Sequence, residues 1–558
     1  MQKQFFYLIG IAAFLYGCGK TTKEQQQTTQ EERKKVFRYN QAEGLTSLDP
    51  AHARTQANIW AVTQLYNGLF EFTESLVEQV CLAESYDVSS DGKTYIIKIR
   101  KGVHFHDSDV FPDGKGREVT AEDFVYSFKR ILDPNTASSG AWIFNDKVLR
   151  DKNGNISDTC FKALDKYTLA IYLQKQFPPF LQILAMPYCF VVPREAVEKY
   201  GKDFGRNPVG TGPFKFQAWD DGNSLTFLKN PNYWRRDINH NPLPYLDAVQ
   251  ISFIADKNTE FLTFQQGKLD LITGIDASII DQILKKDGTP REEIAQKFTV
   301  QKVDYLNTEY LGFILDPSRY EDKNHPLLDK RVRQALSYAI NREELVSYIR
   351  NNLGVPGDNG FVPPFLPSFD ENKVKGYNFN PDKANALLKE AGYGQGGKKM
   401  PELVLYTTPT YKEISEYLQK QWSSVLGIPV RLEINTFATH LDLVNNGKAM
   451  FFRASWLGDY PDEENFLSCF YSKNFAPAGP NKTRFKNATF DKLYEDVQKI
   501  SGFERHDIYH KLDQIVMNES AVIVLYYDEV LRLTQKYVQG LETNAMNVLK
   551  LEKVDFTN

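Results

Sequence analysis

The chain has 558 residues, of which 42% are hydrophobic and 25% are charged, and its formal net charge is −4. A chain of this length predicts several domains, or one large body divided into lobes. The composition is typical of a globular protein, and it excludes a mainly disordered chain and one that crosses a membrane many times. The mild acidity argues against nucleic-acid binding, which needs a basic surface.

The N-terminus has the pattern of an export signal. One positive charge in "MQKQ" precedes "FFYLIGIAAFLYG", a run of 13 mostly apolar residues before Cys18. A membrane-spanning helix needs about 20 apolar residues, so this run matches the apolar core of a secretory signal instead. "LYGC" resembles a bacterial lipobox, although Tyr16 is bulkier than is usual two residues before the cysteine. The alternative is an uncleaved core strand with an incidental cysteine.

The resemblance to a lipobox implies a signal peptide over residues 1–17 and a diacylglyceryl group on Cys18. The following segment, "GKTTKEQQQTTQEERKK", has no aromatic or aliphatic side chain and cannot pack a core. We therefore expect a lipid-anchored flexible tether over residues 18–35 and a folded body from about Val36. This predicts an exported protein on the periplasmic or extracytoplasmic face of the cell membrane, without determining the envelope type.

Four further cysteines are widely spaced and include no CxxC pair: Cys81, Cys160, Cys189 and Cys469. An exported protein can form disulfides, but their pairing cannot be read from sequence. Four small buried thiols are an alternative of equal weight. The cysteines therefore leave both states open.

Helix and strand patterns mix along the rest of the chain. In residues 94–105, apolar side chains alternate with charged ones, which predicts a half-buried strand. Thr120, with Asp123 three residues later, predicts a capped helix that stops before Pro134. The same reasoning predicts strands over 248–256 and 428–435, a helix from Pro381 to Gly392 and a helix over 411–427. The sequence therefore predicts an α/β protein with mixed sheets.

Four long segments carry a family resemblance. They are "LDPAHARTQANIWAVTQLYNGLFEF" (48–72), "GREVTAEDFVYSFKRILDPNTAS" (116–138), "NPVGTGPFKFQAWDDGNSLTFLKNPNYW" (207–234) and "LLDKRVRQALSYAINREELV" (327–346). In the same order, they resemble segments of the oligopeptide- and dipeptide-binding proteins of bacterial ABC importers, the extracellular solute-binding protein family 5. Asn67 and Asn341 replace acids that are usual in the family. The resemblance spans roughly residues 36–545.

The resemblance implies a type II periplasmic-binding-protein-like α/β fold (cluster C) in which two lobes close over a ligand. One lobe would combine residues 36–66, 193–310 and 525–558, and the other would be residues 311–524. An additional inserted domain, residues 67–192, would pack onto the first lobe. Such a protein captures short peptides and delivers them to an ABC permease driven by separate ATPase subunits. We expect a monomer without a cofactor.

The stretch "FFRASWLGDYPDEENFLSCF", residues 451–470, interrupts an apolar run with one base and four acids. Burying charge costs free energy unless the charge is paired. The stretch resembles the RAGW-x-x-DY segment of oligopeptide-binding proteins. This implies that Asp459 binds the peptide α-ammonium and that Arg453 lies within reach of the peptide carboxylate. Trp456 and Tyr460 would line the groove.

The physical chemistry agrees with these roles. A zwitterionic peptide carries a cation at one end and an anion at the other, so one acid and one base can read its polarity. Six extended residues cover about 20 Å, so the chain must bend between Arg453 and Asp459, and "GDYP" predicts that turn. Alternatively, the two pair with each other, or the acids form a solvated loop. Asp462, Glu463 and Glu464 have no counterpart in the resemblance, and we expect them to face solvent.

Two other segments are candidates for the ligand site. Trp142, in "SSGAWIFN", could close the pocket from the inserted domain, but core packing is an equal alternative. The segment "HARTQAN" (52–58) sits where relatives offer backbone groups to the ligand, although individual contacts cannot be assigned.

Signatures of enzyme chemistry are absent from the sequence, which has no G-x-S-x-G, Walker lysine loop, HExxH or GxGxxG. His104 and His106 share a strand face, and His506 and His510 lie one helical turn apart, a spacing that zinc can use. Without a third ligand nearby, we expect structural or surface histidines, no metal and no enzyme activity.

Several functions remain as hypotheses. The first is a lipid-anchored peptide receptor of an ABC importer. The second is a receptor of the same fold for a nickel complex, an opine or another small solute, which would not need the pair of Arg453 and Asp459. The third is a lipid-anchored hydrolase that uses the acids as paired carboxylates, and a chaperone-like or adhesive role is also open. The sequence does not determine peptide length, side-chain preference or the purpose of uptake.

Overall fold

The computed structural model describes residues 34–275, 277–394 and 396–557. The expected signal peptide, the lipidation site Cys18 and nearly all of the expected tether lie outside these ranges. The described residues from Lys35 onward form one compact unit, and its first strand, β1, begins at Val36. Within the described ranges, no helix combines the length and apolarity that a membrane crossing requires.

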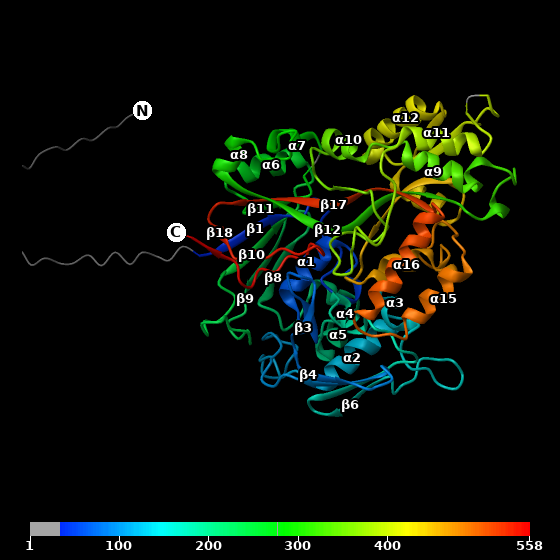
Figure 1. Cartoon of the computed structure of the whole chain (residues 1–558). Helices are drawn as coiled ribbons and strands as arrows, with labels where there is room; N and C mark the ends of the chain where they lie inside the picture. Colours follow the sequence, from blue (N-terminus) through cyan, green and yellow to red (C-terminus); the bar gives the residue numbers. More distant parts are fainter. Residues whose placement is uncertain (1–33, 276, 395, 558) are drawn as a thin grey trace, which may run out of the picture. The chain divides into compact units, whose positions relative to one another are not determined.

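A mixed sheet of 11 strands forms the centre of this unit (Figure 1). Its order is β15 (Val430–Ile434), β14 (Leu403–Thr407), β16 (Phe451–Leu457), β12 (Phe298–Phe313), β17 (Val522–Gln535), β11 (Leu271–Thr273), β1 (Val36–Asn40), β10 (Ala248–Ser252), β9 (Ser224–Lys229) and β8 (Phe214–Asp220), with β13 (Val355–Pro356) on β17. Strand β1 is parallel to β10 and β11, and β14 is parallel to β15 and β16. The other pairs are antiparallel, so the expected mixture of directions is present.

A second sheet lies at the opposite end of the view from α9, α11 and α12 (Figure 1). It has four antiparallel strands in the order β4 (Ala83–Val88), β5 (Thr94–Ile99), β7 (Thr168–Tyr172) and β6 (Phe161–Asp165). All four fall within the segment expected as the inserted domain, residues 67–192. Two short ribbons pair β2 (Phe70–Phe72) with β3 (Glu78–Val80) and β18 (Val538–Gln539) with β19 (Asp555–Phe556).

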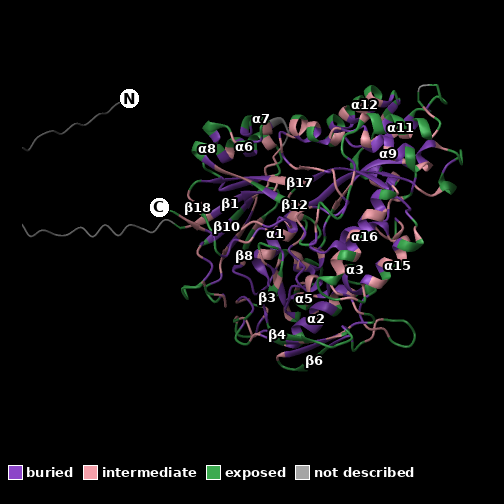
Figure 2. Cartoon of the chain, in the orientation of Figure 1, coloured by how far each residue is buried: buried purple, intermediate pink, exposed green. Residues whose placement is uncertain are grey.

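The α-helices surround these sheets. They are α1 (Gln56–Leu65), α2 (Ala121–Leu132), α3 (Trp142–Asn145), α4 (Phe180–Leu184), α5 (Arg194–Tyr200), α6 (Lys257–Gln265), α7 (Ala277–Ile283), α8 (Glu292–Lys297), α9 (Lys330–Tyr338), α10 (Arg342–Glu344), α11 (Pro381–Glu390), α12 (Lys412–Leu426), α13 (Phe437–Asn445), α14 (Glu463–Leu467), α15 (Ala488–Val497) and α16 (Glu504–Asn518). Figure 2 shows buried residues along the sheets and exposed ones on the outer helices, including α8, α11 and α12.

Local sequence signals placed several elements correctly. Thr120 and Asp123 form the predicted capping box of α2, in which the Asp123 carboxylate accepts from the Thr120 backbone at 2.8 Å. Helix α12 covers nearly all of 411–427 and is capped by Gly427, which follows its last residue and takes the left-handed conformation (φ 65°). Helix α11 starts at Pro381 as predicted but ends at Glu390.

The predicted strands are shorter than their sequence patterns. Strand β5 stops at Ile99, six residues before the end of the predicted range 94–105, and β10 stops at Ser252. Strand β15 lies at the edge of the large sheet, and Ile434 at its end is 42% exposed. Alternation therefore identified the strands, but the neighbouring strands decided where they end and how far they are buried.

Two long strands connect distant parts of the chain. Strand β12 pairs with β16 on one side and β17 on the other. Both β12 and β17 cross boundaries expected between the lobes, after residue 310 and after residue 524. Leu311 is the register partner of Arg453, and this register brings β12 side chains to the charged stretch of β16.

Candidate ligand-binding site

A cavity lies where α1, residues 185–190, residues 544–552 and the end of β16 meet. It contains about 1340 Å³ of empty space, part of which is open to solvent. Aromatic and aliphatic side chains such as Trp60, Phe70 and Met186 make up most of its wall. The charged residues that line it are Arg54, Glu71, Asp459, Lys550 and Glu552. A mostly apolar wall with a few polar groups is typical of a site for a small ligand.

Asp459 lines this cavity just beyond the end of β16, at the predicted bend. Asn465 holds it from behind: Oδ1 accepts from the Asp459 backbone N–H at 3.0 Å, and Nδ2 donates to Asp459 Oδ2 at 3.3 Å. The indole N–H of Trp456 donates to the same Asn465 Oδ1 at 3.0 Å. Trp456 therefore acts one step behind Asp459, through Asn465, and is not among the described residues that line the cavity.

The Asp459 carboxylate carries its charge without a partner ion. Its side chain is exposed, but it lines the cavity, so protein surrounds the carboxylate. Desolvation by that protein raises the pKa of Asp459 to about 6, and Arg54 only partly opposes the shift. Among the described residues, no cation lies within ion-pair distance of this carboxylate. A ligand that supplies a cation would stabilise the ionised form of such an acid.

Arg453 lies in the sheet, where it forms a buried ion pair with Glu309. Its Nε and Nη2 donate to Glu309 at 3.1 Å and 2.6 Å, and both side chains are buried. The guanidinium also lies over the ring of Tyr411, 3.3 Å from the ring centroid. Because Leu311 faces Arg453 in the register, Glu309 is its diagonal neighbour on the same sheet face. Arg453 thus binds a neighbouring carboxylate, and the described cavity lining does not include it.

We expected the remaining acids of this stretch to face solvent, and this was wrong. Asp462, Glu463 and Glu464 are all buried. Asp462 is the N-cap of α14, and Arg505 on α16 donates to both of its oxygens at 2.7 Å and 2.9 Å. Glu464 accepts hydrogen bonds from two tyrosine hydroxyls. Burial and the charge of Asp462 raise the pKa of Glu463 to about 7. Arg505 and the tyrosine hydroxyls therefore satisfy Asp462 and Glu464 inside the protein.

Tyr460 belongs to this buried group. Its hydroxyl donates to Glu464, and its ring packs edge-on against Phe177 at a centroid distance of 6.4 Å. Its side chain is 4% exposed. Tyr460 therefore supports the chain next to Asp459 and is not among the described residues that line the cavity.

Tyr188 supplies an aromatic side chain to the cavity from the segment expected as the inserted domain. A Cβ atom at Gly140 would lie 2.4 Å from the Tyr188 ring, so the glycine of "SSGAW" permits this close approach. Trp142 itself is 37% exposed on α3, with the ammonium of Lys147 5.9 Å from its ring centroid. The described lining thus contains Tyr188 where we expected Trp142.

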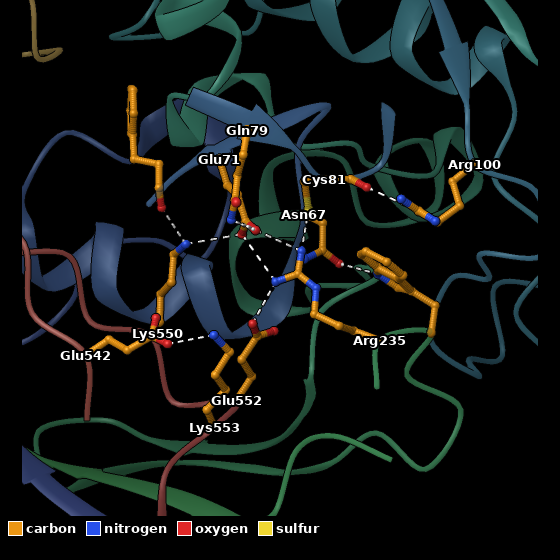
Figure 3. A network of polar contacts seen from close by, with 12 residues as sticks. Asn67, Glu71, Gln79, Cys81, Arg100, Arg235, Glu542, Lys550, Glu552 and Lys553 are labelled. Carbon is orange, nitrogen blue, oxygen red and sulfur yellow. Dashed lines mark hydrogen bonds and ion pairs between the residues drawn. The ribbon is translucent and has the colours of Figure 1, made fainter. Parts of the chain in front are cut away.

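A balanced network of charges forms another part of the cavity wall (Figure 3). Arg235 lies between two acids, with Nη2 3.0 Å from Glu71 and Nη1 2.6 Å from Glu552. Lys550 Nζ is 3.2 Å from the other Glu71 oxygen. Burial alone would raise the pKa of Glu71, but Arg235 and Lys550 lower it below its usual value. Two acids and two bases neutralise each other here, so this wall presents little net charge to a ligand.

The four cysteines of the described chain are free and buried, which confirms the alternative of buried thiols. Burial and the charge of Glu71 raise the pKa of Cys81 to about 12. A thiol with so high a pKa stays protonated at neutral pH and is a poor nucleophile. Cys81 therefore contributes surface to the cavity, not reactivity.

The histidines bond mainly to the backbone. His104 contacts the Gly116 carbonyl at 2.8 Å, and buried His106 contacts the Gly212 carbonyl at 3.0 Å. His510 contacts the Ser368 carbonyl at 2.6 Å. In the parts of the chain that the structure describes, no three His, Cys, Asp or Glu side chains are grouped to hold a metal ion.

Sequence reasoning missed three parts of the site: Arg54, Tyr188 and residues 544–552. "HARTQAN" was a candidate only for its backbone, although it contains Arg54. Residues 544–552 have no charge pattern that separates them from an ordinary C-terminal segment. Their place in the wall follows from hydrogen bonds to α1, in which Trp60 Nε1 and Gln64 Nε2 donate to the carbonyls of Asn547 and Leu549 at 2.6 Å and 2.7 Å.

Residues 79–477 match the sequence pattern of the bacterial extracellular solute-binding proteins, family 5 Middle, and the chain belongs to this family. Solved structures of periplasmic binding proteins align with most of the chain. The match to MppA in its unliganded open form covers 94% of this chain, with a TM-score of 0.75. The protein thus has the type II periplasmic-binding-protein fold, with mixed sheets, as the sequence predicted.

The relatives are named for different ligands. The dipeptide-binding protein DppE of Bacillus subtilis is 26% identical, and the match covers 98% of this chain and 97% of that protein. The structure of DppA from Helicobacter pylori in complex with the peptide STSA is 26% identical, covers 94% of this chain and 98% of that chain, and has a TM-score of 0.73. The probable deoxycholate-binding periplasmic protein YgiS of Escherichia coli is 29% identical, with 90% of each chain covered.

Proposed function

We propose that this protein is the exported, lipid-anchored substrate-binding protein of a peptide ABC transporter. It captures short peptides in the cavity and delivers them to a membrane permease driven by separate ATPase subunits. The observation that carries the proposal is Asp459, an acid in a mostly apolar cavity with no ion-pair partner among the residues that the structure describes. The relatives named for dipeptide binding and for the complex with STSA support the same ligand class. Cys18 is the proposed anchor, and the mature protein acts as a monomer without enzyme activity.

In this proposal the α-ammonium of the peptide binds to Asp459, and Asn465 keeps the carboxylate aimed into the cavity. Every peptide with a free N-terminus carries this cation whatever its side chains are. The apolar wall accepts side chains by burial, which discriminates less sharply than hydrogen bonds do. The site is therefore specific for a free peptide N-terminus and discriminates only weakly between side chains.

Titration calorimetry with Ala-Phe and trialanine tests the proposal. Asp459→Asn keeps the shape of the side chain but removes its charge, so we expect a loss of about 3–5 kcal/mol in binding free energy, which is more than about a hundredfold in affinity. N-acetylation of the peptide should cause a loss of similar size in the wild-type protein and little further loss in the variant. If wild-type protein binds free and N-acetylated peptides equally well, Asp459 does not bind the ammonium.

A receptor of the same fold for a non-peptide solute is the second candidate. The mostly apolar cavity wall and the relative named for deoxycholate favour it. A nickel complex, an opine or another small molecule belongs to this alternative. Native mass spectrometry of the purified protein, with fragmentation of whatever co-purifies, separates the two: mixed short peptides support the first candidate, and a single defined solute supports the second.

A further inference from the structure

Arg54 is the one charged residue of the described cavity wall, besides Asp459, that has no ion-pair partner within the structure. It is exposed and lines the cavity, and no described acidic side chain lies within ion-pair distance of its guanidinium. Lys550, in contrast, is paired with Glu71. Arg54 is nevertheless close enough to Asp459 to lower the pKa of that acid. Among the described residues, the cavity wall thus contains one unpaired acid and one unpaired base.

The loop before α1 holds the backbone of Arg54 in place. Ser138 donates from its hydroxyl to the Ala51 carbonyl at 2.6 Å, and Asn58 donates from Nδ2 to the His52 carbonyl at 3.4 Å. Thr55, the next residue, is the N-cap of α1 and accepts from the Asn58 backbone. A ligand therefore needs to order only the Arg54 side chain, which lowers the entropic cost of binding.

A second base adds positive potential behind the same wall. Arg532 on β17 is fully buried, and its Nε and Nη1 have no hydrogen-bond partner among the described residues. Its Nη2 donates to Asn547 Oδ1, and its guanidinium lies 5.4 Å from the ring centroid of Trp60. Asn547 and Trp60 both line the cavity. Desolvation lowers the pKa of Arg532 only to about 10, so the charge is kept at neutral pH and favours an anion nearby.

We propose that Arg54 binds the C-terminal carboxylate of a short peptide whose α-ammonium is bound at Asp459. This inference rests on the proposed function and assigns the carboxylate to Arg54 instead of Arg453. Two residues of extended peptide span at most about 7 Å, and three span about 11 Å. Asp459 and Arg54 line the same cavity, so the two ends of one short peptide can contact both side chains.

The test compares Ala-Phe as free acid and as C-terminal amide, by calorimetry on the purified protein. Wild-type protein should bind the acid about 10- to 100-fold more tightly than the amide. Arg54→Gln should bind the two equally, with the wild-type affinity for the amide. Arg54→Lys should restore part of the preference. Arg194→Gln, at a side chain 61% exposed on α5, is the matched control and should behave as wild type.

Outcomes against the inference can be separated from failure of the proposed function. If Arg54→Gln keeps the acid preference while Arg453→Gln removes it, the carboxylate binds at Arg453 and the inference is overturned. If wild-type protein needs Asp459 and a free N-terminus but binds acid and amide equally, only the assignment of Arg54 fails. If it binds neither form, the proposed function fails and the inference fails with it. Thermal melts of each variant check that it is folded.

Discussion

Asp459 and Asp462 lie three residues apart, yet the fold treats their charges in opposite ways. Asp462 caps a helix and is bonded at both oxygens to Arg505. Asp459 is bonded to a neutral amide and faces a cavity, and its pKa is raised to about 6. Arg453 on the preceding strand belongs with the paired group, since Glu309 satisfies it. The comparison teaches that a charge already paired inside the fold supports structure, whereas a charge left without a partner can recognise a ligand.

We expect the largest effect on stability from a substitution that breaks an ion pair. Arg453→Met leaves Glu309 buried without its partner, so we expect a loss of about 3–5 kcal/mol in the free energy of unfolding. Urea denaturation measures this loss. Adding Glu309→Leu removes the orphaned charge and should recover most of it. The peptide affinity of folded Arg453→Met should stay within about twofold of wild type. A large loss of affinity with unchanged stability would instead show that Arg453 binds the ligand.

The pH dependence of binding sharpens the description of Asp459 as an unpaired acid. Below about pH 6 its carboxylate becomes protonated, and above about pH 8 the peptide α-amino group loses its charge. Calorimetry with Ala-Phe should therefore show the highest affinity between these values and about a tenfold loss for each pH unit beyond them. Asp459→Asn should lack the acidic limb.

Without ligand, Asp459 should stabilise the fold more as the pH falls, although peptide binding becomes weaker over the same pH range. The pKa of Asp459 is raised in the folded state, so the folded protein binds the proton more tightly than the unfolded chain does. The contribution of Asp459 to unfolding free energy should thus increase as the pH falls from 7 through 6. Thermal melts of wild type and Asp459→Asn isolate this contribution as the difference between two curves. A difference that does not change with pH would contradict the raised pKa.

The smallest expected effect concerns Tyr460. Tyr460→Phe removes one of the two hydroxyls that donate to Glu464, so we expect a loss of about 1 kcal/mol in unfolding free energy. Peptide affinity should not change, because the ring remains and the hydroxyl points to Glu464. Calorimetry and denaturation on one preparation give both numbers. A variant that loses affinity and keeps its stability would make Tyr460 part of the ligand site.

Much of the fold could be predicted from sequence because its signals are local or long. The capping box of Thr120 and Asp123 acts within one helical turn, and Gly427 can end α12 because only its own backbone must turn. Four ordered segments identified the family, which the match over residues 79–477 confirms. The ends of β5 and β10 were not predictable, since a strand ends where its neighbours cease to offer hydrogen bonds.

The sequence by itself determined the family, the α/β class and the bend at which Asp459 lies. Only the tertiary structure decided which charges of residues 451–470 are paired. Glu309 is 144 residues from Arg453, and Arg505 is 43 residues from Asp462. An ion pair depends on distance in space, which sheet register and helix packing set and local patterns do not contain. For the same reason Arg54, an ordinary loop arginine in sequence, becomes the unpaired base of the cavity only once the chain is folded.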